Sequence, residues 1–141
     1  DTPDLTALVR AILRPHGEER AFINGPLIRC TSQATTAMAL VLHELATNAA
    51  KYGSLSTPDG SISVTRQKER DGLLLTWVEQ GGPEVKAPPA NGFGAHLLRT
   101  TVVNQFGGAL NYGWLPEGLV VTMRLPMAQS SDLLSPGAAR T

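Results

Sequence analysis

The segment "LHELATNAAKYG", residues 42–53, decides how this 141-residue chain is interpreted. It ends a longer stretch, residues 31–53, in which apolar residues recur at helical spacing: Met38, Val41, Leu42, Leu45 and Ala49. We therefore predict a long helix that Thr31 or Ser32 caps and that Gly53 ends.

The polar residues of this segment share one edge of the predicted helix. Glu44 and Asn48 are four residues apart and Lys51 follows Asn48 by three, so all three project beside the apolar stripe. A carboxylate, an amide oxygen and an ammonium group in one row suit a complex of Mg²⁺ with phosphate. A solvated helix face explains the segment alone equally well. A zinc site is excluded, because Thr47 stands where an H-E-x-x-H motif needs its second histidine.

Composition limits the classes of function. Twelve basic and twelve acidic residues cancel, so no net field favours nucleic acid or an anionic membrane. No apolar run approaches ~20 residues and the N-terminus is not a signal peptide, so we expect no direct membrane insertion and a cytoplasmic location. Cys30 is the single cysteine and we expect it to be inert. Because the first residue is not Met, we expect the chain to be part of a longer protein.

Periodicity and turn residues predict the remaining elements. Helical spacing marks residues 4–13, with Asp4 as the cap, and residues 95–106. Strand signals flank an Asn24-Gly25-Pro26 turn within residues 21–30. Further strands are predicted at residues 61–67, 73–80, 108–114 and 118–126.

The predicted strands are mainly connected as hairpins. The turns are Arg70-Asp71-Gly72 and Pro116-Glu117-Gly118. Hairpins favour a two-layer α/β sandwich, with a mixed, mostly antiparallel sheet and helices packed on one face, over a doubly wound parallel fold. Residues 127–141 are predicted to be a disordered tail.

Two glycine-containing loops follow the long helix. In "WVEQGGP", residues 77–83, Trp77 and Glu79 face the same side of a strand. Glu79 can accept a hydrogen bond from an exocyclic amine, while Gly81 and Gly82 let the backbone come close to a flat ring.

The second loop, "NGFGAHLL" at residues 91–98, runs from Gly92 and Gly94 into a helix. This arrangement directs free backbone N–H groups at an anion. A lone G-x-G is more often just a turn, the third glycine of a dinucleotide fingerprint is missing, and no Walker A sequence is present. The order of helix motif, acidic glycine loop and G-x-G loop is what makes the set specific.

That order resembles the catalytic domains of histidine kinases in the GHKL superfamily. "HELAT" is also similar to a phosphoacceptor box, but Asn48 stands where that box has Pro, and strands and glycine loops follow. The closer resemblance is to the HWE family, named for a His in the helix motif and a W-x-E in the first glycine motif. His43 and Trp77-Val78-Glu79 match both. The resemblance covers residues 20–126, with residues 1–19 as an N-terminal helix and linker from a preceding dimerisation region.

The resemblance implies a role for each matching residue. Asn48 would coordinate Mg²⁺ that bridges the phosphates of ATP, Glu44 would lie near the metal-bound water, Lys51 would approach phosphate and Glu79 would accept the adenine amine. Tyr52 would pack either near the nucleotide or in the core. His43, at the helix–sheet border, and Trp77 are interpreted as structural. Further residues implied to contact ATP are Gly81, Gly82, Gly92, Phe93, Gly94 and Leu97.

The resemblance also implies partners that this chain lacks. The γ-phosphoryl group of ATP would pass to a histidine on separate dimerisation helices, and then to an Asp of a response regulator. The fragment alone is expected to be a monomer that cannot phosphorylate itself. Only eight residues, 84–91, separate the glycine loops, which implies a short lid and modest affinity. The alternative is a degenerate domain that docks a partner and turns over little or no nucleotide.

Overall fold

The computed structural model describes residues 4–84, 94–127 and 132–136. Its helices are α1 (Leu5–Leu13), α2 (Ser32–Tyr52) and α3 (Ala95–Arg99), which continues as the π-helical η4 (Thr100–Gln105). Short 3-10 turns are η1 (Arg14–His16), η2 (Glu18–Arg20) and η3 (Ser54–Ser56). The strands are β1 (Ala21–Asn24), β2 (Arg29–Cys30), β3 (Ser61–Glu69), β4 (Gly72–Gln80), β5 (Ala109–Leu115), β6 (Gly118–Pro126) and β7 (Leu133–Leu134).

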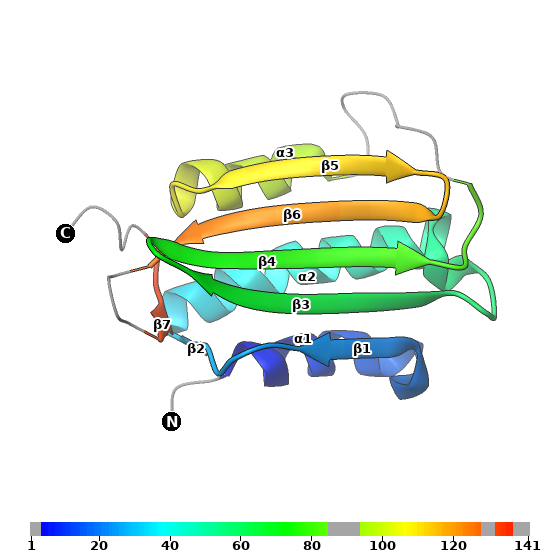
Figure 1. The fold of residues 1–141 in the computed structure, drawn as a ribbon, viewed down its shortest axis with the longest axis horizontal. Helices are drawn as coiled ribbons and strands as arrows, with labels where there is room; N and C mark the ends of the chain where they lie inside the picture. The colour runs from blue at the N-terminus through cyan, green and yellow to red at the C-terminus, as the bar shows by residue number, and fades with distance from the viewer. Residues whose placement is uncertain (1–3, 85–93, 128–131, 137–141) are drawn as a thin grey trace.

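Five strands form one sheet in the order β1-β3-β4-β6-β5. β1 runs parallel to β3, and the other three pairings are antiparallel. The helices lie together on one face of this sheet (Figure 1). The predicted two-layer α/β sandwich with a mixed, mostly antiparallel sheet is therefore confirmed.

The long helix α2 forms as its sequence predicts. The Thr31 hydroxyl caps it by accepting a hydrogen bond from the backbone N–H of Ala34 at 3.2 Å, and Gly53 follows its last residue. The predicted apolar stripe is buried against the sheet: Met38, Val41, Leu42, Leu45 and Ala49. The opposing residues come from alternate positions of the two central strands: Leu73, Leu75, Trp77, Leu119, Val121, Met123 and Leu125.

Both predicted hairpins are present. Arg70 and Asp71 connect β3 to β4, and Pro116 and Glu117 connect β5 to β6. In the described part of the chain no helix is long and apolar enough to cross a membrane.

The N-terminal helix belongs to the core, although the sequence interpretation placed residues 1–19 before the domain. Leu5, Val9 and Leu13 of α1 are buried in the same cluster as the stripe of α2. The backbone N–H of Leu5 also donates to the carbonyl of Ile28 at 2.7 Å. The apolar face of α1 thus packs in the same core as α2. The origin of residues 1–19 in a preceding dimerisation region stays a prediction.

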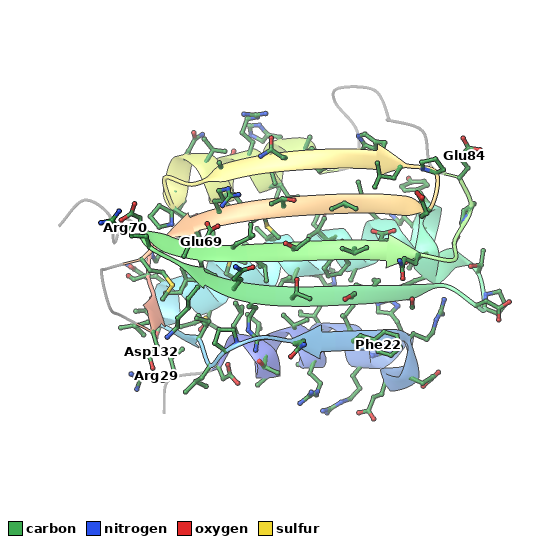
Figure 2. The ribbon with its side chains drawn as sticks, in the orientation of Figure 1. Phe22, Arg29, Glu69, Arg70, Glu84 and Asp132 are labelled. Carbon is green, nitrogen blue, oxygen red and sulfur yellow. The ribbon has the colours of Figure 1, made fainter. Side chains whose placement is uncertain are left out.

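The predicted disorder of residues 127–141 is wrong for the described part of this segment. Leu133–Leu134 form β7, which pairs in parallel with β2. Leu134 is fully buried, and the Asp132 carboxylate accepts a hydrogen bond from the Arg29 guanidinium at 3.0 Å. Figure 2 shows these two side chains next to each other. A strand of two apolar residues is too short to show alternation, so the sequence did not reveal it.

Candidate functional site

The candidate site begins where the end of α2 meets the end of β4. A Cβ atom added to Gly53 would lie 2.1 Å from Oε1 of Glu79, so the helix end and the strand end are in direct contact. Gly53 has φ −114°, so what selects glycine here is close packing and not backbone conformation. The end of α2 therefore packs directly against the carboxylate that was predicted to bind a base.

The Glu79 carboxylate is buried and held by two donors. The backbone N–H of Ser54 donates to Oε1 at 3.1 Å, and the indole Nε1–H of Trp77 donates to Oε2 at 2.9 Å. Glu79 is 3% exposed and Trp77 is fully buried. Burial raises the pKa of Glu79, and the two hydrogen bonds lower it in part. Trp77 packs in the core as expected, and it also contacts the acidic residue directly.

The first glycine loop packs against the protein's own backbone. Gly81 has φ +80°, and a Cβ atom there would lie 2.9 Å from the carbonyl oxygen of Asp59. At Gly82 a Cβ atom would lie 2.5 Å from the Cα atom of Ser54. The close approach that these glycines permit is thus to η3 and the loop after it. Whether they also approach a flat ring stays a prediction.

The second part of the candidate site lies along the polar edge of α2. Nδ2 of Asn48 donates to Oε2 of Glu44 at 3.0 Å, so the two residues predicted to share an edge are in contact. Gly94 lies against Glu44, because a Cβ atom there would fall 2.4 Å from Cγ of Glu44. Gly94 has φ +63°, a conformation that glycine adopts at little cost. The end of the second glycine loop therefore meets the helix motif.

Other predicted site residues have different surroundings. Lys51 is exposed on the last turn of α2, and Leu97 is half-buried on α3. Tyr52 is 56% exposed, so the interpretation of it as a core aromatic is wrong. Gly92 and Phe93 lie outside the described residues.

Two structural expectations for single residues have opposite outcomes. His43 is exposed, so its expected place at the helix–sheet border is wrong; it follows buried Leu42 and projects from the outward side of α2. Cys30 is buried, and burial, with a smaller effect of the Asp4 charge, raises its pKa to about 11. A thiol with a raised pKa is a weak nucleophile, in agreement with an inert role.

Sequence reasoning missed a set of contacts that Arg20 makes. Its guanidinium donates to the backbone carbonyls of Gly60 at 2.9 Å, Ser54 at 3.1 Å and Thr57. The Thr57 hydroxyl in turn donates to the carbonyl of Gly81 at 3.0 Å. Arg20 thereby fixes the segment between α2 and β3 on which the first glycine loop rests. Nothing in the sequence marks it, because its acceptors are backbone atoms 34 or more residues away.

The donor atoms near Asn48 fit a metal that a nucleotide brings with it. Within the described residues no group of three or more His, Cys, Asp or Glu side chains could hold a metal ion alone. Mg²⁺ commonly takes one or two protein oxygens and completes its shell with phosphate and water. The amide of Asn48, oriented by its bond to Glu44, could supply one such oxygen.

A hollow of about 460 Å³ lies elsewhere, at the end of the sheet that carries the β3–β4 turn. Its lining includes Glu69, Arg70 and Arg124, and none of the predicted site residues. Figure 2 places Glu69 and Arg70 at the end of the sheet opposite Glu84, which follows the first glycine loop. This hollow therefore does not coincide with the predicted site.

Comparisons with known proteins agree with this architecture. No family model matches the chain. The blue-light-activated histidine kinase 1 of Erythrobacter litoralis strain HTCC2594 is 34% identical over 140 residues, which cover 92% of this chain and 39% of that protein. A blue-light-activated histidine kinase of Brucella anthropi is 37% identical over 109 residues, which cover 74% of this chain and 22% of that protein. The chain thus spans well under half the length of these relatives.

Among solved structures, the catalytic domain of histidine kinase ThkA superposes with a TM-score of 0.69 at 15% identity, covering 96% of this chain and 98% of that domain. At this identity the superposition shows the fold alone. The fold is that of a histidine kinase catalytic domain. Over most of its length the chain is similar in sequence to the blue-light-activated histidine kinases named above.

Proposed function

We propose that this chain is the catalytic, ATP-binding domain of a sensor histidine kinase. It binds Mg²⁺-ATP and transfers the γ-phosphoryl group to a histidine on dimerisation helices outside this sequence, from which an Asp of a response regulator receives it. The observation that carries the proposal is the pair of polar contacts along α2. On the edge of α2, Glu44 contacts Gly94 and accepts a hydrogen bond from Asn48; at the end of α2, Glu79 contacts Gly53 and Ser54.

The Glu79 end of α2 is proposed to bind the base. Each carboxylate oxygen accepts one internal hydrogen bond and retains a second lone-pair direction. The exocyclic amine of adenine is a donor and suits this acceptor. The backbone around Ser54 and Gly82 is closely packed, so the base would meet a preformed surface.

The polar edge of α2 at Glu44 and Asn48 is proposed to bind the phosphates. Asn48 and Glu44 lie 5 and 9 positions before Gly53, about 7 and 14 Å along the helix axis. That separation lets one extended nucleotide contact both the Glu79 carboxylate and the polar edge of α2. Asn48 would hold Mg²⁺, Glu44 would orient the Asn48 amide and metal-bound water, and the Lys51 ammonium would neutralise phosphate charge. The ion supplies further neutralisation of the phosphate oxygens.

In the proposed reaction, a bond forms between an imidazole nitrogen of the acceptor histidine and the γ-phosphorus. The bond from the γ-phosphorus to the bridging oxygen breaks, ADP leaves with that electron pair, and the imidazole releases its N–H proton to solvent. This domain forms no covalent intermediate. Its residues hold the nucleotide in line with the acceptor and offset its negative charge, which are the dominant contributions in phosphoryl transfer.

Calorimetric titration of this chain with a non-hydrolysable ATP analogue tests the proposal. Binding is expected with Mg²⁺ and is expected to weaken when EDTA removes the ion. The matching GTP analogue, as the control ligand, should bind less tightly. Absence of binding at millimolar nucleotide would contradict the proposal and favour a docking module without nucleotide turnover.

A further inference from the structure

The hydrogen bond between Trp77 and Glu79 gives this tryptophan more than a packing role. Both residues lie on β4, two positions apart, and both point toward the helix layer. The indole Nε1–H donates to Glu79 Oε2 at 2.9 Å, and neither side chain is more than 3% exposed. A buried indole that only packed would leave its N–H without an acceptor, at a cost to stability.

The two donors to Glu79 come from different elements and fix the carboxylate at both oxygens. Ser54 donates with its backbone from η3, so a substitution of its side chain leaves that bond in place. Among the described residues, the indole of Trp77 is the one side-chain donor to this carboxylate. A glutamate has three side-chain torsions, and two anchored oxygens hold them in one arrangement.

We propose that Trp77 is a positioning residue that sets nucleobase selectivity by holding the Glu79 carboxylate toward the base. The inference rests on the proposed function and deepens it. With Oε1 and Oε2 each occupied by one fixed donor, their remaining lone pairs have fixed directions, and a donor such as the adenine amine is accepted there. Guanine carries a carbonyl oxygen in the place of that amine, and a fixed carboxylate repels it.

The same hydrogen bond also favours the ionised form of Glu79. Burial raises the pKa of this carboxyl, and the indole and the Ser54 N–H act against that rise. Among the described residues, burial and these two hydrogen bonds shift the pKa of Glu79, and no charged side chain adds to the shift. Loss of the indole N–H therefore does two things: it releases the carboxylate, and it favours a protonated carboxyl, which can donate to a guanine carbonyl.

Trp77→Phe is the variant that tests this inference, because it removes the N–H and keeps an aromatic ring. Trp114→Phe on β5 is the matched control, since Trp114 stacks on Tyr112 with ring centroids 6.0 Å apart. Dissociation constants for Mg²⁺-ADP and Mg²⁺-GDP are measured for the wild type and both variants, with circular dichroism to verify folding. The preference for ADP is expected to fall roughly tenfold in Trp77→Phe and to be unchanged in Trp114→Phe.

A pH series separates positioning from a general loss of packing. The preference for ADP over GDP should be lost as pH falls through the pKa of Glu79. In Trp77→Phe, the pH at which half of this preference is lost, its midpoint, should be higher than in the wild type. A folded Trp77→Phe with wild-type preference and midpoint would overturn the inference and leave the proposed function intact. A wild type that binds neither nucleotide would instead overturn the proposed function.

A measurement on the wild type covers the case in which Trp77→Phe does not fold. The indole ¹⁵N–¹H resonances of Trp77 and Trp114 are followed by NMR while Mg²⁺-ADP or Mg²⁺-GDP is added. The Trp77 resonance is expected to move more with ADP than with GDP, and the Trp114 resonance is the internal reference. An equal response of the Trp77 resonance to both bound nucleotides would overturn the inference.

Discussion

Polar side chains are exposed at one end of the five-stranded sheet and buried at the other. The exposed end is the end at the β3–β4 turn, and the buried end is the one where β4 meets the end of α2. At the β3–β4 turn, Glu69 and Arg124 form an ion pair at 2.5 Å whose side chains are 34% and 54% exposed. At the other end, the Glu79 carboxylate is buried among donors from β4 and η3. Figure 2 shows the first end directly, at Glu69 and Arg70.

This difference bears on function. An exposed ion pair is screened by water and contributes little to stability, so it needs no further explanation. Burial of a carboxylate costs free energy of desolvation, and an apolar residue in its place would pack in the core equally well. Glu79 is retained with two dedicated donors and a glycine, Gly53, that makes room for it. The buried end is therefore where selection for chemistry, and not for solubility, is expected.

Gly53→Ala should have the largest effect on the stability of the buried end. The new methyl group would lie 2.1 Å from Oε1 of Glu79 and would displace the carboxylate or the end of α2. We expect a loss of about 3 kcal/mol in the free energy of unfolding, measured with urea, and loss of nucleotide binding. Gly113→Ala is the control, because its methyl group would meet Val120 at an ordinary 3.7 Å. Equal stability of the two variants would contradict the proposed packing.

Asn48→Ala should affect binding more than folding. It removes the amide that is proposed to hold Mg²⁺ and also the hydrogen bond to Glu44. Affinity for the ATP analogue in Mg²⁺ is expected to fall about 10- to 100-fold, as for the loss of a charge-assisted contact. Calorimetry with and without Mg²⁺ measures this. A variant that keeps the full Mg²⁺ dependence of the wild type would remove Asn48 from the metal site.

Arg20→Ala should loosen the segment between α2 and β3. Three backbone carbonyls lose their guanidinium donor, and the free energy of unfolding should fall by about 2 kcal/mol. Arg20→Lys should recover only part of this loss, because an ammonium group lacks the fork that reaches three carbonyls. Arg124→Ala at the exposed end is the comparison and should leave urea unfolding unchanged. A similar cost at both ends would contradict the contrast between them.

The pH dependence of stability should differ between the wild type and Glu79→Gln. Because the folded-state pKa of Glu79 is raised, its favourable contribution is fully present below the unfolded-state pKa. That contribution is lost as pH rises through the raised folded-state value. Urea unfolding from about pH 4 to pH 8 should therefore show Glu79→Gln gaining stability relative to the wild type as pH rises. A difference that does not change with pH would show that Glu79 is not held in a desolvating environment.

Much of the fold could be predicted from the sequence because its determinants are local. The apolar spacing of α2 and the turn residues at Arg70-Asp71 and Pro116-Glu117 act over a few residues. The pairing of β7 with β2 and the packing of α1 depend on partners distant in sequence, and no period reveals them. The turn at Asn24-Gly25-Pro26 was predicted, but β1 pairs with β3 and not with β2.

The candidate site divides in the same way. The spacing of Glu44 and Asn48 on one helix edge and of Trp77 and Glu79 on one strand face predicted which side chains lie together, and both pairs are hydrogen-bonded. Arg20 was missed because its acceptors are backbone carbonyls, which any sequence provides. The burial of Glu79 was not predicted either, since it depends on how Gly53 and Ser54 close over the end of β4.

Backbone amide NMR of the ¹⁵N-labelled chain, titrated with Mg²⁺-ADP, tests the central claim most directly. We predict shifts concentrated at the buried end and along α2, at Ser54, Gly81 and Gly94, with little change at Glu69 and Arg124. Saturating shifts confined to the exposed end, or no shifts at millimolar nucleotide, would contradict the assignment of the nucleotide site to the end of α2.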